Sequence, residues 1–392
     1  MSDVVFLAGA RTPFGAFMGS LFAVAAPRLG SVAIQAALEK AGVASDQISE
    51  VIMGTVLAAG QGQAPARQAM IYAGIPDSVP AMTINKVCGS GMKAIMLAAQ
   101  SIRLGESEIA VAGGMENMSQ VPYMLPGARE GLKMGEKPMV DSMVADGLWD
   151  PYNNQHMGNC GELCAEKGNY SREDQDAFAI ESFRRAQEAQ KGGKFEPEIA
   201  PVTIKGRKGD TIVDQDEGPM KASFERFPKL RPAFSKEGTI TAANASSIND
   251  GAAAVVIASD EKAMEMGLKP VARLVSSAQH SLDPQWFTTA PEFAMRKALE
   301  KASWSVDEVD LFEVNEAFAV VSMTAADKLG IPREKLNVWG GAISLGHPIG
   351  ASGARIVVTL LSALKDRGLK KGCAGICIGG GEATALCLEM LD

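Results

Sequence analysis

The second half of the chain repeats short sequences of the first half, and this internal duplication restricts the possible folds more than any other feature. Three pairs of segments match in nearly one register: 37–41 with 298–302 and 46–48 with 307–309, each offset by 261 positions, and Ser90-Gly91 with Ser352-Gly353, offset by 262. Self-similarity of this kind is typical of a repeated structural unit. We therefore predict two copies of one unit, packed together.

Within each unit, apolar stretches of strand length alternate with stretches that suit a helix. The pattern predicts a helix at 29–41, strands at 4–10, 48–53 and 109–114, and a short buried strand at 79–84. Such alternation is typical of an α/β fold in which helices cover both faces of a mostly parallel sheet. The length of 392 residues, 41 of them glycine, suits two or three domains with many tight turns.

Residues 119–249, between the two copies, differ in character. A helix is expected after Ser171, which suits an N-cap, and it continues to Gln190. The segment 205–236 carries eight basic and five acidic residues. Two interpretations stay open for this charged segment: a solvated surface loop, or a clamp for a substrate that bears phosphate.

Cys88 lies where the predicted strand at 79–84 turns into a helix, within a stretch rich in Gly and Ser. The unpaired backbone N–H groups and the positive end of a helix dipole would then lie near the sulfur. Such a position is expected to lower the thiol pKa from about 8.5 toward neutrality and to favour the nucleophilic thiolate. The alternative is a small buried apolar side chain at a tight turn.

Three other stretches combine reactive or polar side chains with the end of a predicted element. His347 lies in a glycine-dense loop before a helix, Cys377 ends a strand just before three glycines, and Asn315 and Glu316 lie where a strand gives way to a helix. Glycine lets the backbone approach a ligand closely. Each stretch taken alone is also what an ordinary cap or turn would look like.

Four motifs together resemble the thiolase family in their order and spacing: Asn85-Lys86-Val87-Cys88-Gly89-Ser90-Gly91, Asn315-Glu316-Ala317-Phe318, Gly346-His347-Pro348-Ile349-Gly350 and Cys377-Ile378-Gly379-Gly380-Gly381. The resemblance implies a five-layered α-β-α-β-α sandwich of two βαβαβαββ halves, with a loop domain inserted in the first half. The first half would comprise residues 1–118 and 250–268, the inserted CoA-binding domain 119–249, and the second half 269–392. It also implies a homotetramer, a dimer of tight dimers.

The resemblance implies a reversible Claisen condensation of two acetyl-CoA to acetoacetyl-CoA and CoA. Cys88 would be the acylated nucleophile, and Cys377 the acid and base that handles the α-proton of the second substrate. His347 would activate Cys88 and help to hold a thioester oxygen, together with a water fixed by Asn315. The backbone N–H groups of Cys88 and Gly379 would form a second oxyanion hole. Two thiols and two oxyanion holes provide what this reaction needs without a metal.

The implied substrate specificity depends on fewer residues. His156-Met157-Gly158 resembles the segment that distinguishes acetoacetyl-CoA thiolases of the biosynthetic type, in which the histidine contacts the acyl-CoA. Long-chain degradative thiolases tend to lack that histidine. A histidine here would also suit a capped loop, so a broader 3-ketoacyl-CoA thiolase of fatty-acid β-oxidation is the alternative.

Further contacts to CoA are implied by matching motifs: Leu148, Phe234, Ala242, Ser246, Phe287 and Ala317. This chain departs from the family pattern at two positions near them. Some relatives have an arginine near the CoA phosphates where this chain has Met220, so Lys221 becomes the candidate for that role. Ser247 stands where the family often has glycine.

Composition and charge argue against other classes of protein. A net charge of −8 is unlike the basic footprint of a nucleic-acid binder, and no apolar run is long enough to cross a bilayer. The six cysteines lack the spacing of a zinc site, which predicts reduced thiols in a cytoplasmic protein without metal. The family resemblance implies that CoA and acyl-CoA are substrates rather than cofactors. A decarboxylating ketoacyl synthase would carry two histidines, or His and Asn, in place of Cys377. A non-catalytic acyl-CoA-binding relative would be expected to lose Cys88.

Overall fold

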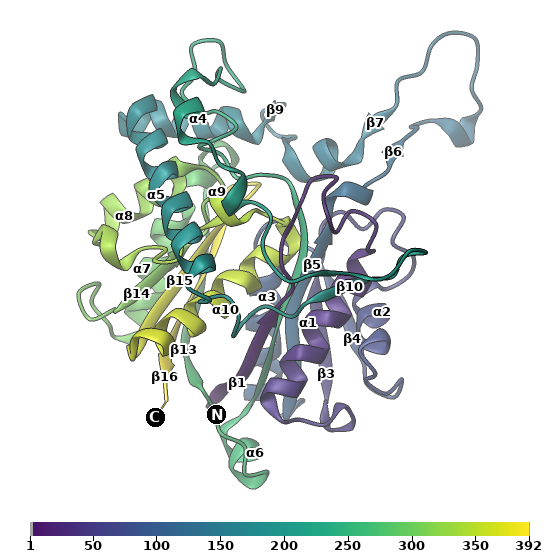
Figure 1. The fold of residues 1–392 in the computed structure, drawn as a ribbon, viewed down its shortest axis with the longest axis vertical. Helices are drawn as coiled ribbons and strands as arrows, with labels where there is room; N and C mark the ends of the chain where they lie inside the picture. Colours follow the sequence, from purple (N-terminus) through teal and green to yellow (C-terminus); the bar gives the residue numbers. More distant parts are fainter. Residues whose placement is uncertain (1–2, 392) are drawn as a thin grey trace.

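Two groups of strands form the centre of the protein. The computed structural model describes residues 3–391. The first group runs in the order β4-β3-β5-β12-β1 and contains β1 (Val4–Arg11), β3 (Glu50–Gly54), β4 (Ala81–Ile84), β5 (Ile109–Asn117) and β12 (Asn249–Ser259). The second runs in the order β14-β15-β16-β13 and contains β13 (Ala272–Ser281), β14 (Leu311–Val314), β15 (Lys371–Ile378) and β16 (Glu382–Met390). Short antiparallel pairing between β1 and β13 joins the two groups into one sheet path (Figure 1).

The prediction of a mostly parallel sheet is wrong: among the described strands of this sheet, only β3 with β4, β3 with β5 and β14 with β15 pair in parallel. The last strand of the second half, β16, follows β15 through a short turn rather than a helix, so it pairs antiparallel.

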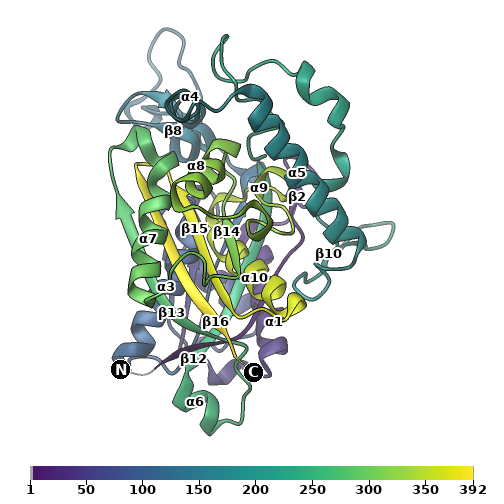
Figure 2. The ribbon, with the colours of Figure 1, turned by 90° about the vertical axis from the view of Figure 1, so that its left-hand side faces the viewer.

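Helices cover both half-sheets on the outside and also fill the space between them. The outer helices of the first half are α1 (Ala26–Ala41) and α2 (Pro65–Tyr72). In the second half, α7 (Ala290–Ala302) and α8 (Ala319–Leu329) lie over the strands, as Figure 2 shows. Between the half-sheets lie α3 (Ser90–Leu104) and α10 (Ile349–Arg367). The chain therefore forms the predicted five-layered α-β-α-β-α sandwich.

Burial on both faces explains why the central strands are apolar throughout. On β12, Val255 and Ile257 belong to the core around α3 and α10, whereas Ala254 and Val256 belong to the outer core under α1. Successive side chains of a strand point to opposite faces, so a strand between two helical layers needs apolar residues at every position. Ten of the eleven residues of β12 are accordingly buried.

The sequence duplication is a duplication of structure. Each element of the first half has a counterpart at the same place in the second: β1 and β13, α1 and α7, β3 and β14, α3 and α10, β5 and β15, β12 and β16. The counterpart of β4 is reduced to a single parallel bridge between Phe312 and Leu336. The prediction of two packed copies of one unit is confirmed.

The two central helices cross at a pair of glycines. A Cβ atom on Gly91 of α3 would lie 2.7 Å from the backbone nitrogen of Ala354. A Cβ atom on Gly353 of α10 would lie 2.6 Å from the backbone nitrogen of Met92. These are the glycines of the matching Ser-Gly pairs, so the repeat in the sequence marks the helix crossing. The contact brings the first turns of both helices close together.

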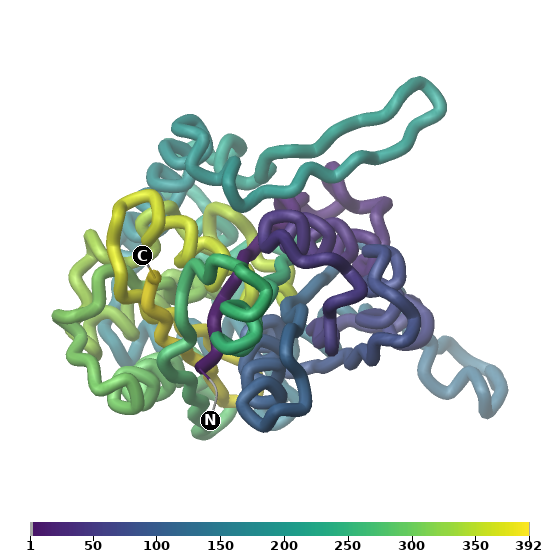
Figure 3. The backbone as a smooth tube through the Cα atoms, turned by 90° about the horizontal axis from the view of Figure 1, so that it is seen from below, coloured from purple at the N-terminus to yellow at the C-terminus, as the bar shows by residue number. Residues whose placement is uncertain are grey.

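Residues between β5 and β12 form a separate layer of helices and loops above the sandwich. Its helices are α4 (Met157–Gly168) and α5 (Arg172–Lys191), and its short strand pairs are β6 (Tyr123–Met124) with β7 (Val140–Asp141), β8 (Trp149–Asp150) with β9 (Gln155–His156), and β10 (Val202–Ile204) with β11 (Thr211–Val213). The loop between β6 and β7 and the β10–β11 hairpin project from the body (Figure 3). The remaining short elements are β2 (Gly15–Ala16), α6 (Asp260–Glu265) and α9 (Ala342–Leu345).

Two local expectations had different outcomes. Ser171 is the N-cap of α5, where its Oγ accepts a hydrogen bond from the Asp174 N–H at 3.0 Å, so the predicted cap is confirmed.

The strand predicted at 79–84 is present as β4, but the prediction that it is buried is wrong. The strand β4 is the last in the sheet order and is only partly covered, with 46 % of Met82 exposed. A short apolar run has the same sequence signature at the edge of a sheet as in its centre.

Candidate active site

A cavity of about 270 Å³ opens where the first turns of α3 and α10 meet the inserted region. Its lining is mostly apolar, and Cys88, His156 and His347 are its titratable side chains. Nine residues predicted for the site line it: Cys88, Leu148, His156, Phe234, Ser246, Phe287, Ala317, His347 and Gly379. They come from both halves and from the inserted region, so the fold brings together residues that lie up to 291 positions apart in the chain.

The turn that carries Cys88 is strained and firmly held. Val87 has a φ of +45°, a left-handed conformation that is unusual for a β-branched residue and costs about 1–3 kcal/mol. The Val87 N–H donates to Asn85 Oδ1 at 2.9 Å, and its carbonyl accepts from Ser90 Oγ at 2.7 Å. Ser90 Oγ also accepts from the Lys86 N–H at 2.8 Å. Side-chain bonds at both ends thus keep a backbone conformation that directs Cys88 into the cavity.

The loop after β15 lies directly against this turn. A Cβ atom on Gly379 would lie 3.5 Å from Val87 Cγ1, and one on Gly89 would collide with the side chain of Ile378. The backbone N–H groups of Gly379 and Cys88 both face the Cys88 sulfur and favour its charged form. Two N–H donors that converge on one point are the arrangement of an oxyanion hole.

Burial nevertheless keeps Cys88 protonated. Cys88 is half-buried against apolar neighbours, and this desolvation raises its pKa to about 11, against the lowering effect of the two N–H groups. The charge of buried Glu116 adds to the increase. The expectation that the helix start would lower the pKa of Cys88 is therefore wrong, because loss of solvation outweighs the nearby backbone dipoles. Attack by Cys88 requires a base that removes its proton.

His347 lines the same cavity and has the tautomer and charge that such a base needs. Its Nδ1 lies 2.6 Å from Ser352 Oγ, whose hydroxyl donates to the Pro348 carbonyl at 2.9 Å. Nδ1 is therefore the donor to Ser352, and the neutral ring keeps a free lone pair on Nε2. Nε2 is buried without a hydrogen-bond partner among residues 3–391. Burial, with Arg355 nearby, lowers the pKa of His347 to about 3, so the imidazole is neutral near pH 7.

Cys377 lies on β15, and Asn315 directly follows the parallel neighbour β14. The Asn315 N–H donates to the Gly375 carbonyl at 3.0 Å, just beyond the paired part of β14 and β15. Both atoms of the Asn315 carboxamide are buried without a partner within the described residues. Burial, and next the charge that Cys88 would carry, hold the pKa of Cys377 well above its usual range. The two thiols are therefore close enough for a charge on Cys88 to raise the pKa of Cys377.

His156 caps a helix and also lines the cavity. Its Nδ1 accepts a hydrogen bond from the Gly158 N–H at 3.0 Å and so caps α4. Its ring also lines the cavity and stacks on Phe234, with 4.8 Å between the ring centroids. Burial lowers the pKa of His156, so the ring is neutral and carries its proton on Nε2. It offers the cavity a single hydrogen-bond donor.

Two predicted contacts to CoA lie away from the cavity. Lys221 is mostly exposed and forms an ion pair with Glu217 at 3.5 Å. Ala242 is exposed on the loop before Asn244 and does not line the cavity. Four further cysteines, Cys160, Cys164, Cys373 and Cys387, are buried in the apolar core.

Two buried carboxylates hold the catalytic loops, and the sequence did not single out the first. Glu116, at the end of β5, accepts hydrogen bonds from the N–H groups of Val56 and Gly350 at 2.9 Å each, and its burial raises its pKa to about 7. Glu316 accepts from Asn337 Nδ2 at 2.8 Å and from the Ile343 N–H at 3.2 Å. Glu116 could have been found from the sequence, because it is an acidic residue at the end of an otherwise apolar predicted strand.

Two family models together match nearly the whole chain: Thiolase, N-terminal domain, over residues 4–261, and Thiolase, C-terminal domain, over residues 268–390. The chain belongs to the thiolase family. It is 53 % identical to an acetyl-CoA acetyltransferase of Cupriavidus necator, over 99 % of this chain and 100 % of that protein. Acetyl-CoA acetyltransferase 2 of Arabidopsis thaliana is also 53 % identical, with coverage of 99 % and 97 %.

A solved structure resembles this thiolase over its whole length. The crystal structure of the Bacillus anthracis acetyl-CoA acetyltransferase superposes with a TM-score of 0.97 at 42 % identity, covering 100 % of this chain and 99 % of that one. No helix within residues 3–391 of the thiolase chain is long and apolar enough to cross a membrane.

The raised pKa of Cys88 in this thiolase predicts how its alkylation depends on pH. With a pKa of about 11, the rate of reaction with iodoacetamide should rise about tenfold per pH unit from pH 6 to 10 without a plateau. Mass spectrometry of the Cys88 peptide measures the rate, with N-acetylcysteine in the same tube as the reference thiol. A midpoint below pH 8 for Cys88 would show that the helix start, and not burial, decides its ionisation.

Proposed function

We propose that this protein is an acetyl-CoA C-acetyltransferase that reversibly joins two acetyl-CoA into acetoacetyl-CoA and CoA through an acetyl-Cys88 intermediate. The observation that carries the proposal is that Cys88 and His347, one from each half, line a single cavity beside the Gly379 loop. Two full-length relatives at 53 % identity that are named acetyl-CoA acetyltransferase support it. So does the buried second thiol, Cys377, whose pKa a charge on Cys88 would raise and which a decarboxylating ketoacyl synthase would lack.

In the first half-reaction, Nε2 of His347 takes the proton from Cys88 while the sulfur attacks the carbonyl carbon of acetyl-CoA. The backbone N–H groups of Cys88 and Gly379 face this sulfur and would stabilise the oxyanion of the tetrahedral intermediate. When the C–S bond to CoA breaks, the leaving sulfur takes the proton of Cys377. The products are CoA, acetyl-Cys88, protonated His347 and the thiolate of Cys377.

In the second half-reaction, the thiolate of Cys377 takes an α-proton from a second acetyl-CoA. The enolate oxygen would be held by the protonated Nε2 of His347 and by a water that the Asn315 carboxamide fixes, since that carboxamide has no partner among the described residues. The enolate carbon attacks acetyl-Cys88, and acetoacetyl-CoA forms as the C–S bond to Cys88 breaks. Cys88 then recovers its proton from His347. All groups return to their first state, so the cycle needs no cofactor or metal.

The proposed partners are acyl-CoA thioesters, with neither nucleic acid nor membrane, in keeping with the net charge of −8. We place the protein in the cytoplasm, because a reducing compartment keeps two neighbouring catalytic thiols reduced.

The roles of the two thiols can be separated by trapping the acetyl group. Cys88→Ala should take no label from radioactive acetyl-CoA, since it lacks the nucleophile. Cys377→Ala should still be labelled but should turn over about a hundred- to ten-thousandfold more slowly, the usual cost of losing an acid or base. The label is counted on denatured protein and the rate is measured in the steady state. A stable acetyl thioester on Cys377 in Cys88→Ala would show that the roles are wrongly assigned.

Substrate preference separates the proposed activity from a broader 3-ketoacyl-CoA thiolase. The bulky side chains of His156, Met157, Phe234 and Phe287 line this cavity of about 270 Å³, and we expect them to leave little room for a long acyl chain. Initial rates of thiolysis should therefore give a higher kcat/KM for acetoacetyl-CoA than for a longer 3-ketoacyl-CoA. If the longer substrate were preferred by more than about tenfold, or 1.4 kcal/mol, the alternative would hold.

We also propose that the protein is a homotetramer. The loop between β6 and β7 projects from the body (Figure 1) and exposes 59 % of Leu132 and 68 % of Met139. Exposed apolar patches of this kind usually mark an interface.

Light scattering should give about four times the chain mass of 41.1 kDa. Replacing Leu132 and Met139 by Ser should lower this mass to that of a dimer, because the apolar contact is lost. A monomer, or a tetramer unaffected by the substitutions, would contradict the proposed assembly.

A further inference from the structure

We propose that Arg172, Asp176 and Asn244 are positioning residues for the substrate. They hold residues 227–246, the wall segment, from which Phe234, Ala245 and Ser246 line the cavity, and so control acyl-CoA binding rather than the chemical steps. None of the three lines the cavity. The inference rests on the proposed function, because it takes acyl-CoA as the ligand of this cavity.

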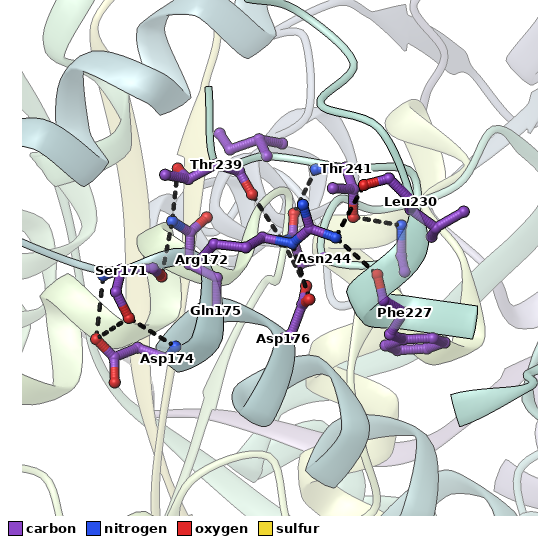
Figure 4. Close-up of polar contacts among 12 residues, drawn as sticks. Ser171, Arg172, Asp174, Gln175, Asp176, Phe227, Leu230, Thr239, Thr241 and Asn244 are labelled. Atoms are coloured by element: carbon purple, nitrogen blue, oxygen red, sulfur yellow. Dashed lines mark hydrogen bonds and ion pairs between the residues drawn. The ribbon is translucent and has the colours of Figure 1, made fainter. Parts of the chain in front are cut away.

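Arg172, at the first position of α5, fixes two points of the wall. Its Nη2 donates to the Phe227 carbonyl at 2.6 Å and to the Leu230 carbonyl at 3.1 Å. Its Nε donates to Asp176 Oδ2 at 2.8 Å, one helical turn along α5. Figure 4 shows the guanidinium between Asp176 and the two carbonyl groups. Because the guanidinium is planar, one side chain sets the direction of both contacts.

Asn244 continues the network from the other oxygen of Asp176. Its Nδ2 donates to Asp176 Oδ1 at 2.9 Å and to the Thr239 carbonyl at 3.1 Å. Its Oδ1 accepts from the Thr241 N–H at 2.8 Å (Figure 4). Asn244 is fully buried and Asp176 nearly so, which strengthens these contacts and makes their loss costly.

The residues held in this way are the ones that shape the cavity. Phe234, which stacks on His156, lies between the fixed points Leu230 and Thr239. Ser246 follows Asn244 in the chain and donates its N–H to the Ala317 carbonyl at 3.0 Å. Residues 230–246 form no helix or strand apart from a single bridge at Ala245. With few backbone bonds of its own, this wall depends on the side-chain network for its position.

The same helix offers a matched control. Arg185, also on α5, donates its Nε to Glu181 at 2.8 Å. Its Nη1 donates to the carbonyls of Arg333 and Leu336 at 3.1 and 2.6 Å. It therefore makes the same set of contacts as Arg172, but to a segment that contributes no residue to the cavity.

The test compares Arg172→Gln with Arg185→Gln in the full-length protein. We expect Arg172→Gln to raise the KM for acetoacetyl-CoA in thiolysis, and the Kd for CoA measured by calorimetry, by about fivefold or more, with kcat within about twofold. Arg185→Gln should leave all three within about twofold. Thermal unfolding measures how much stability each variant loses. If Arg172 had only a structural role, the two variants would lose similar stability and show similar changes in KM and Kd.

Equal changes in KM for the two variants, or a fall in kcat at unchanged KM, would overturn the inference. If Arg172→Gln does not fold, Asp176→Asn is used in its place, because it removes the charge that orients Arg172 while it keeps the buried volume. It should raise KM and Kd in the same direction. The wild-type protein tests the proposed function separately: if it neither binds CoA nor cleaves acetoacetyl-CoA, that function is wrong whatever the variants do.

Discussion

The close crossing of α3 and α10 is the contact on which the rest of the structure depends. Gly91 and Gly353 let the two helices touch backbone to backbone, in the middle layer of the sandwich. Cys88 lies two residues before the start of one helix and His347 two residues before the start of the other, so the crossing sets the distance between these two residues. A larger side chain at either glycine would force the helices apart, because backbone atoms cannot yield as a side chain can.

The position of the cavity between the halves also determines the ionisation of its groups. Little solvent reaches Cys88 or His347, and burial keeps both neutral by moving their pKa values in opposite directions. Charge therefore forms only when a proton moves between neighbours during the reaction. The nearby carboxylates of Glu116 and Glu316 accept hydrogen bonds from Gly350 and Asn337, respectively. These bonds hold the loops around the cavity.

Much of the fold could be predicted from periodicity and local chemistry. The alternation of strands and helices and the cap at Ser171 depend on residues close in sequence. The duplication was visible in short segments that match between the halves. These three predictions are confirmed. The predicted burial of the strand at 79–84 was wrong, because an apolar run does not reveal whether the strand lies at the edge of the sheet or in its centre. The prediction of a lowered pKa for Cys88 was wrong, because a helix start is visible in a sequence, whereas the apolar cavity around the thiol is not.

The sequence by itself determined the family, the repeated unit and the candidate catalytic residues, because each is encoded in short motifs with a fixed order. Tertiary structure alone decided which candidates share a cavity, and it left Lys221 and Ala242 outside it. It also revealed Arg172, whose partners lie 55 and 58 residues away along the chain. Burial and contacts of this kind depend on the folded chain as a whole, so no local pattern in the sequence can encode them.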